Sequence, residues 1–142
     1  MALLGPGIEA QVRALLSRLD DPVVLHYFPV DGHPSSDSMQ RLLDELAWVN
    51  PKLRVFHHAG PILPVAPEMA DDREGPVTVV STSDAAASIR FLGFPGGHEF
   101  AVLLQSLVAV STRRDPQLGT GTKQFLAGFR HPLHFQVFVT PT

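Results

Sequence analysis

Apolar residues recur with the period of a helix in two places in the first half of the chain. A first helix is predicted over residues 8–19, with its apolar positions on one face. A second ends at Asn50–Pro51, where proline cannot continue it. Its buried stripe consists of Met39, Leu42, Leu43, Leu46 and Val49. Asp37 and Gln40 stand at the spacing of a capping box near its start, which predicts that polar side chains cap this helix.

Four segments have the composition or the alternation of β-strands. They are residues 22–28, 52–58, 76–81 and 89–92. The first, PVVLHYF, is apolar on both faces, as is typical of a central strand covered by helices. The segment 59–75 contains three prolines, so it is predicted to be a loop with at most one helical turn near residues 68–71.

The stretch from Ile89 to Ser111 combines a short strand, a tight turn and an amphipathic helix that begins near His98. Its turn contains Gly93, Pro95, Gly96 and Gly97. The apolar positions of the helix share one face and are Phe100, Leu103, Leu104, Leu107 and Val108. Together with the earlier elements, this stretch predicts an α/β fold in which a mixed central sheet is flanked by helices.

The chain changes character after Thr112. Residues 113–121 are a polar linker, and Phe125, Leu126 and Phe129 then predict a short helix capped by Thr120 or Thr122. Phe135, Val137 and Val139 alternate along a predicted last strand. A lone helix and strand cannot form a core, so the piece is expected to pack on the rest of the chain or to pair with another chain. We therefore divide the sequence into residues 1–112 and an extension, residues 113–142.

Composition narrows the function classes. The 142 residues are enough for one compact domain with an appendage, and the net charge of -3 provides no broad basic surface for nucleic acid. No apolar run is long enough to span a bilayer, and the first residues lack the pattern of a signal peptide, so a cytoplasmic protein is expected. Cysteine is absent, which excludes disulfides, thiolate metal sites and thiol redox chemistry within these residues.

The segment Gly93-Phe94-Pro95-Gly96-Gly97-His98-Glu99-Phe100 is similar to a Gly-x-Pro-x-Gly-His-Glu-Phe signature. That signature occurs in the first thioredoxin-like unit of two families. One comprises the protein disulfide oxidoreductases with two glutaredoxin-like units, and the other is the N-terminal domain of the alkyl hydroperoxide reductase flavoprotein subunit. The resemblance implies a thioredoxin-like fold, with Pro76 at the place of the fold's cis-proline ahead of the third strand.

The resemblance also implies where an active site would lie. The Cys-x-x-Cys of the disulfide oxidoreductases corresponds to His33-Pro34-Ser35-Ser36, so both thiols are missing and the motif is degenerate, as in the first unit of the flavoprotein subunit. The residues after 113 resemble the start of a second thioredoxin-like unit, up to the strand that precedes its Cys-x-x-Cys. We expect neither a catalytic residue nor a cofactor in this chain.

Two functions are considered for the segment His33–Ser36, which we call the corner. The first is a non-catalytic interaction or scaffold domain of a disulfide or peroxide redox system, with a protein partner, a second thioredoxin-like unit or a second copy bound through the last strand. The alternative is a small enzyme or a ligand- or metal-binding domain, since His33, Ser35, Ser36 and Asp31 are the residue types of a nucleophile relay. We favour the first, with the serines capping the helix.

Metal binding is not predicted from the seven histidines. His57 and His58 are adjacent on a strand and should point to opposite faces, so they cannot readily share one ion. His98 is expected to hold the glycine turn by a hydrogen bond, with Glu99 favourable to the helix dipole. Trp48 is interpreted as the edge of the core rather than as an anchor for a partner.

Overall fold

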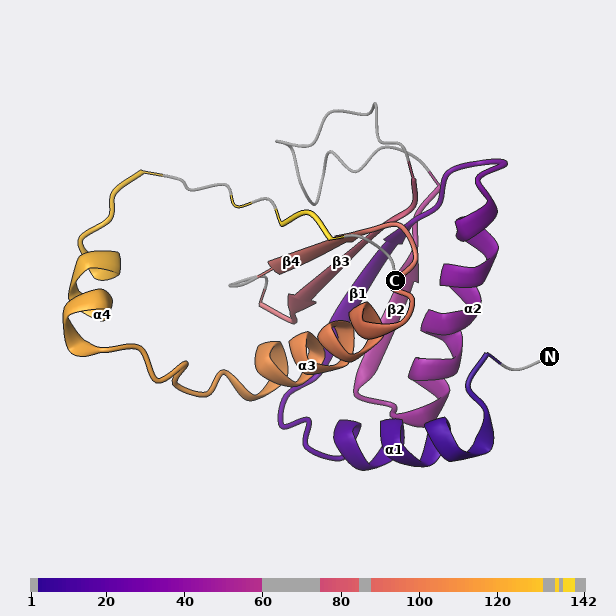
Figure 1. Ribbon diagram of the computed structural model, residues 1–142, viewed down its shortest axis with the longest axis horizontal. Coiled ribbons are helices and arrows are strands. Elements are labelled where there is room, and N and C mark those ends of the chain that lie inside the picture. Colours follow the sequence, from indigo (N-terminus) through magenta and orange to yellow (C-terminus); the bar gives the residue numbers. More distant parts are fainter. Residues whose placement is uncertain (1–2, 60–74, 85–87, 132–134, 136, 140–142) are drawn as a thin grey trace.

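Four strands form a mixed sheet with three helices packed over it, as Figure 1 shows. The computed structural model describes residues 3–59, 75–84, 88–131, 135 and 137–139. The helices are α1 (Pro6–Leu16), α2 (Pro34–Val49), α3 (His98–Thr112) and α4 (Thr120–Ala127). The strands are β1 (Val23–Phe28), β2 (Leu53–His57), β3 (Val77–Thr82) and β4 (Ser88–Leu92). The α/β architecture predicted from the sequence is therefore observed, whereas the turn predicted at residues 68–71 lies outside the described residues.

The strand order is β2-β1-β3-β4. β1 runs parallel to β2 and antiparallel to β3, and β3 runs antiparallel to β4. The register places Leu25 of β1 between Val55 of β2 and Val80 of β3, so these three side chains share one face of the sheet. The two inner strands are β1 and β3, which explains why the segment 22–28 is apolar on both faces.

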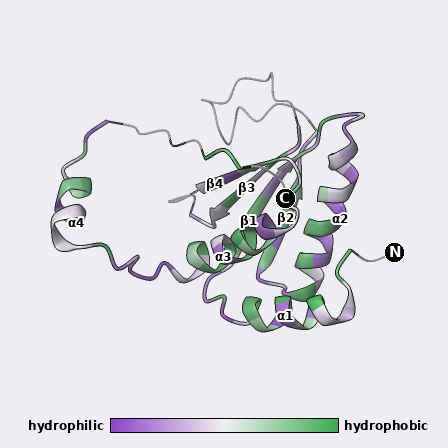
Figure 2. Cartoon of the chain, in the orientation of Figure 1, coloured by the Kyte–Doolittle hydropathy of each residue, from purple (hydrophilic) through white to green (hydrophobic). Residues whose placement is uncertain are grey.

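The hydrophobic core lies between that face and helices α1, α2 and α3, whose apolar sides turn inward in Figure 2. The core residues from β1 are Val23, Leu25 and Tyr27, all fully buried. The stripe predicted on the second helix is buried as expected, from Met39 to Val49. Trp48 does not join it, because this side chain is 85% exposed, and the interpretation of Trp48 as the edge of the core is wrong.

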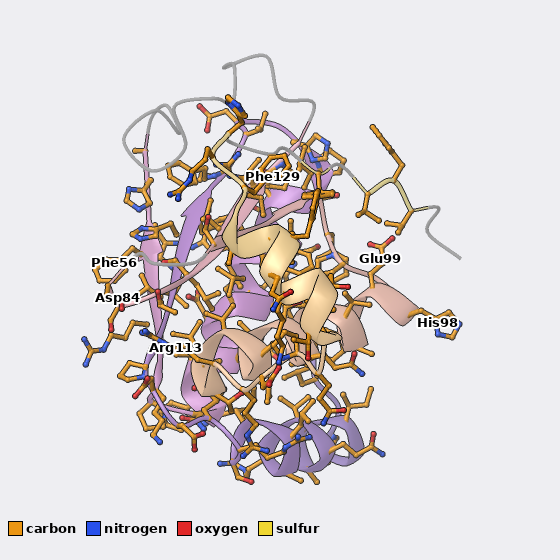
Figure 3. All side chains as sticks on the ribbon, turned by 90° about the vertical axis from the view of Figure 1, so that its left-hand side faces the viewer. Phe56, Asp84, His98, Glu99, Arg113 and Phe129 are labelled. Carbon is orange, nitrogen blue, oxygen red and sulfur yellow. The ribbon has the colours of Figure 1, made fainter. Side chains whose placement is uncertain are left out.

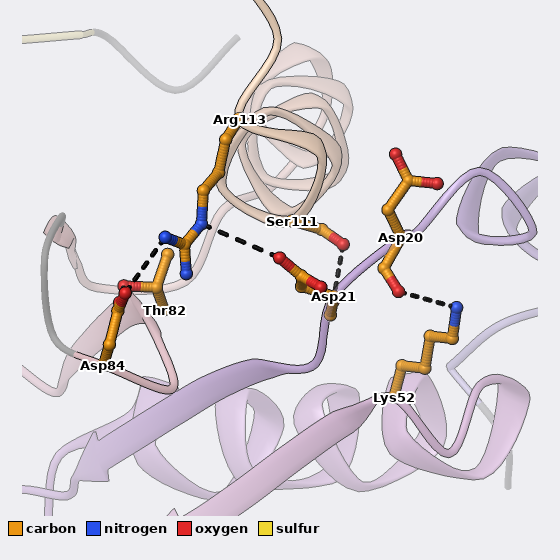
Figure 4. Close-up of polar contacts among 7 residues, drawn as sticks. All are labelled: Asp20, Asp21, Lys52, Thr82, Asp84, Ser111 and Arg113. Carbon is orange, nitrogen blue, oxygen red and sulfur yellow. Dashed lines mark hydrogen bonds and ion pairs between the residues drawn. The ribbon is translucent and has the colours of Figure 1, made fainter.

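Polar contacts pin the end of α3 to the end of the sheet where β1 begins and β3 ends (Figure 4). The Ser111 hydroxyl donates to the Asp21 carbonyl at 2.6 Å. Arg113 has a left-handed backbone (φ 47°), and its guanidinium reaches the carboxylate of Asp84 at 3.0 Å and that of Asp21 at 3.8 Å. Lys52 donates to the Asp20 carbonyl at 2.9 Å. α2 starts after the opposite end of β1, so that end of the sheet is left for the candidate site.

The chain beyond Arg113 departs from the compact body. None of the eight residues of α4 is buried, and Figure 1 shows this helix standing away from the sheet. Gly119 is its N-cap and no side chain caps it, so the predicted cap by Thr120 or Thr122 is wrong. The described residues of the predicted last strand, Phe135 and 137–139, are not in a strand and are exposed. We call residues 114–139 the C-terminal arm.

Candidate functional site at the amino end of α2

The first turn of α2 is capped by His33 rather than by a serine or an aspartate. His33 has an extended backbone, and its ring Nδ1 accepts a hydrogen bond from the Ser35 N–H at 3.2 Å. Pro34 occupies the first helical position, where its missing N–H costs nothing. The capping box predicted from Asp37 and Gln40 is not formed among the hydrogen bonds of this turn. The His33 ring therefore takes the place of the usual short polar cap.

Ser36 closes the loop between β1 and α2. Its hydroxyl donates to the Val30 carbonyl at 2.8 Å and accepts from the Val30 N–H at 3.1 Å. The residue is 8% exposed, so both groups of Val30 are satisfied away from bulk water. Because the Ser36 hydroxyl bonds Val30 and not His33, the nucleophile relay considered at this corner is not assembled.

Tyr27 joins β1 to the first turn of α2 by a hydrogen bond. The side chain is fully buried, and its hydroxyl donates to the Ser36 carbonyl at 2.7 Å. Burial raises the pKa of the Tyr27 phenol, the hydrogen bond with Ser36 opposes that rise, and the nearby charge of Asp37 adds to it. A neutral phenol that donates one hydrogen bond is thus the state that the core favours.

Two segments distant in sequence reach this corner. A Cβ atom added to Gly75 would lie 3.5 Å from Cε1 and Nε2 of the His33 ring, so the chain ahead of β3 passes alongside the capping histidine. The Gly93 N–H donates to the Pro76 carbonyl at 2.7 Å and joins the signature turn to the same segment. The described residues contain no cis peptide bond, so the cis geometry expected at Gly75–Pro76 is not observed.

The signature residues shape the turn between β4 and α3. Gly93 and Gly97 have φ values of 81° and 54°, which only glycine adopts readily, and Pro95 is buried. His98 is exposed and points away from the body in Figure 3, and among the described residues it makes no hydrogen bond. The hydrogen bond predicted from His98 to the glycine turn is therefore not observed. Glu99 does lie in the first turn of α3, as expected.

The second face of the sheet holds a column of rings that the sequence did not reveal. Nδ1 of His26 and Nε2 of His58 lie 2.8 Å apart, and the His26 and Phe56 rings stack at 5.6 Å between centroids. Phe28 stacks on His58 at 4.6 Å. Burial, and secondarily the neighbouring His58, lowers the pKa of His26. The sequence signal was the presence of His26 and His58 in two predicted strands. Their contact depends on the parallel register, which leaves His58 directly after the end of β2.

The side chains of His57 and His58 point to opposite faces of the sheet, as predicted. His57 points to the helix side, where its Nε2 lies 3.1 Å from an Asp44 carboxylate oxygen, whereas His58 joins the ring column on the other face. In the part of the chain that the structure describes, no group of three His, Cys, Asp or Glu residues could hold a metal ion. Nor does any helix there have the length and apolar character needed to cross a bilayer.

Comparison with known proteins finds a relative for part of the chain. No family model matches the chain. The chain is 28% identical over 108 residues to the alkyl hydroperoxide reductase subunit AhpF of Xanthomonas campestris pv. phaseoli, a match that covers 76% of this chain and 18% of that protein. The sequence thus spans less than a fifth of the curated relative's length.

Two solved structures share the fold. The NTD_N/C domain of alkylhydroperoxide reductase AhpF from Enterococcus faecalis V583 matches with a TM-score of 0.71 at 21% identity, over 87% of this chain and 60% of that chain. A protein disulfide oxidoreductase from Aeropyrum pernix K1 matches with a TM-score of 0.68 at 19% identity, over 90% of this chain and 56% of that one. The resemblance predicted from the sequence is confirmed: the chain has the thioredoxin-like fold and is homologous to the N-terminal domain of AhpF.

Proposed function

We propose that this chain is a non-catalytic, thioredoxin-like interaction or scaffold domain of a disulfide or peroxide redox system. The proposal rests on the hydrogen bonds of the His33 and Ser36 side chains. These residues belong to the segment His33–Ser36, to which the resemblance assigns the family's Cys-x-x-Cys. His33 and Ser36 take the positions of the two cysteines in that assignment, and both side chains are used in local hydrogen bonds. The 142 residues contain no cysteine, so this chain has no thiol pair to carry two electrons.

The partner in this proposal is a protein of the same redox system or a second thioredoxin-like unit. Homology to part of a reductase supports this class of partner, because the matched region is a fraction of the relative's length. Pairing of two copies through residues 135–139 is a further option, since Phe135 and Val137 are 82% and 84% exposed in a single copy. The cytoplasmic location and the division at residue 112 remain predictions from the sequence.

The test is a gain of function at the corner. Purified wild-type protein should give no turnover in an insulin-reduction assay with dithiothreitol, and none in a peroxide-reduction assay with a thiol donor. The double substitution His33→Cys and Ser36→Cys should form an intramolecular disulfide and gain turnover, because a helix amino terminus lowers a thiol pKa. The matched control is His33→Cys alone, which has a thiol but no partner for it. Turnover by the wild-type chain would contradict the proposal.

The alternative is a ligand- or metal-binding role for the same corner. No contact favours it over the scaffold role, since the Ser36 hydroxyl is committed to Val30. Elemental analysis of purified protein and a thermal-shift screen with metabolites would reveal such a role. A ligand whose stabilisation disappears in His33→Ala would make this the better account.

A further inference from the structure

Among the described residues of the body, which spans residues 3–112, Trp48 is the most exposed large hydrophobic side chain. It is 85% exposed near the end of α2, although the rest of the helix buries a continuous apolar stripe. Tryptophan is enriched among the residues that dominate the binding energy of protein interfaces. Its indole is available to a partner without any change in the core.

The exposed row of α2 that ends at Trp48 contains two carboxylates and one guanidinium. Asp37, Arg41, Asp44 and Trp48 follow one another at helical spacing, and all are exposed. Arg41 turns back toward the Asp37 carbonyl, to which its Nε donates at 3.4 Å. The partner of Asp44 lies outside this row: Nε2 of the His57 ring is 3.1 Å from an Asp44 carboxylate oxygen. A partner for this row should therefore be apolar beside Trp48 and basic beside Asp44.

The C-terminal arm has that chemistry. Phe125 and Phe129 are 67% and 38% exposed, and their ring centroids lie 5.8 Å apart, one helical turn from each other. Leu126 between them is 45% exposed, and Arg130 follows directly. Residues 114–139 contain three lysines or arginines and one acidic residue, whereas residues 1–112 contain seven and thirteen respectively. The arm and the body are thus complementary in charge.

The arm cannot reach Trp48 of its own chain in this arrangement. Figure 1 places α4 and α2 at opposite ends of the molecule's long axis, with the sheet and α3 between them. A second copy removes that obstacle, since each copy has one arm and one α2 row, and a two-fold axis would use both pairs. We infer that the Phe125–Phe129 pair at the end of α4 in one copy docks on Trp48 of a second copy, with Arg130 facing Asp44 in α2 of that copy.

This inference deepens the proposed function by naming one partner and its surface. The test uses Trp48 as its own probe, because it is the single tryptophan of the chain. The 142-residue chain is diluted through a concentration series while the emission maximum is recorded, with light scattering on a sizing column in parallel. The expected result is a shift to shorter wavelength together with a doubling of the 15.4 kDa mass as concentration rises.

Variants locate the contact. Trp48→Ala, and separately the pair Phe125→Asp and Phe129→Asp, should weaken dimerisation at least about tenfold, and the arm variant should keep solvent-exposed emission at every concentration. Both sites are exposed, so folding should be unchanged by circular dichroism. Phe56→Ala is the matched control, since Phe56 is a 49% exposed aromatic of β2, and it should dimerise as wild type does.

Charge-reversal variants provide a second test of the contact. Arg130→Glu should weaken the dimer, added salt should do the same, and Asp44→Arg combined with Arg130→Glu should restore it. A strict monomer with unshifted emission, or a dimer indifferent to Trp48→Ala, would overturn the inference. Neither result bears on the insulin-reduction and peroxide-reduction assays that test the proposed function, so the two proposals fail separately.

Discussion

The corner at the amino end of α2 and the C-terminal arm differ in how far their side chains are satisfied within one copy. At the corner, the His33 ring and the Ser36 and Tyr27 hydroxyls all have hydrogen-bond partners in the same chain. In the arm, Phe125 and Phe138 are 67% and 89% exposed, and α4 buries nothing. The corner to which the resemblance assigns the family's Cys-x-x-Cys thus has its polar groups satisfied within one copy, while the C-terminal arm exposes apolar side chains that association with a partner would bury.

The largest expected effect is on the free energy of unfolding, to which α2 and the C-terminal arm should contribute very differently. Leu46→Ala removes a fully buried side chain of α2 and should lower the free energy of unfolding by about 2–5 kcal/mol. Phe125→Ala should change it by less than about 0.5 kcal/mol, because that ring is mostly in water in the monomer. Urea titrations at a concentration where the protein is monomeric provide the measurement. A large loss in Phe125→Ala would mean that the arm belongs to the core.

The core and its helices could be predicted because their patterns are long and repetitive. The stripe from Met39 to Val49 and the two-sided apolar run of β1 leave few alternatives for burial. The last strand was predicted from equally clear alternation at Phe135, Val137 and Val139, but a strand also needs a neighbour to bond. Alternation alone therefore predicts which residues can pair, and not whether a partner is present in the same chain.

The details of the corner were less accessible from the sequence. The motif position, His33–Ser36, came from the family resemblance, and the serines and aspartate were expected to cap α2. The structure gives the cap to His33, because Ser36 is drawn into the loop by both polar groups of Val30. Which of several polar neighbours caps a helix depends on where the preceding loop turns, and the glycine at residue 32 (φ 73°) sets that turn.

The next effect tests whether the closed corner depends on its capping ring. His33→Ala should lower the free energy of unfolding by about 0.5–2 kcal/mol, because the Ser35 N–H loses its acceptor. His33→Asn is the control, since a short amide oxygen at the same position is a good cap and should recover most of the loss. Equal destabilisation in both variants would show that the ring acts through its packing beside Gly75 instead.

The smallest effect concerns the ring column on the second face of the sheet. Because the folded state lowers the pKa of His26 below its ordinary value of 6.5, the unfolded chain takes up the proton more readily. The stability linked to His26 is therefore complete above pH 6.5 and is lost progressively as the pH falls below that value, until the folded protein is protonated too. The groups that face His26 are His58 and Phe56, with Val79 opposite it on β3. Urea titrations between pH 7.5 and pH 5 should show this decline, and His26→Phe, which keeps an aromatic ring in the column, should make it shallower. An unchanged slope in that variant would assign the pH dependence to other histidines and leave the column a packing feature alone.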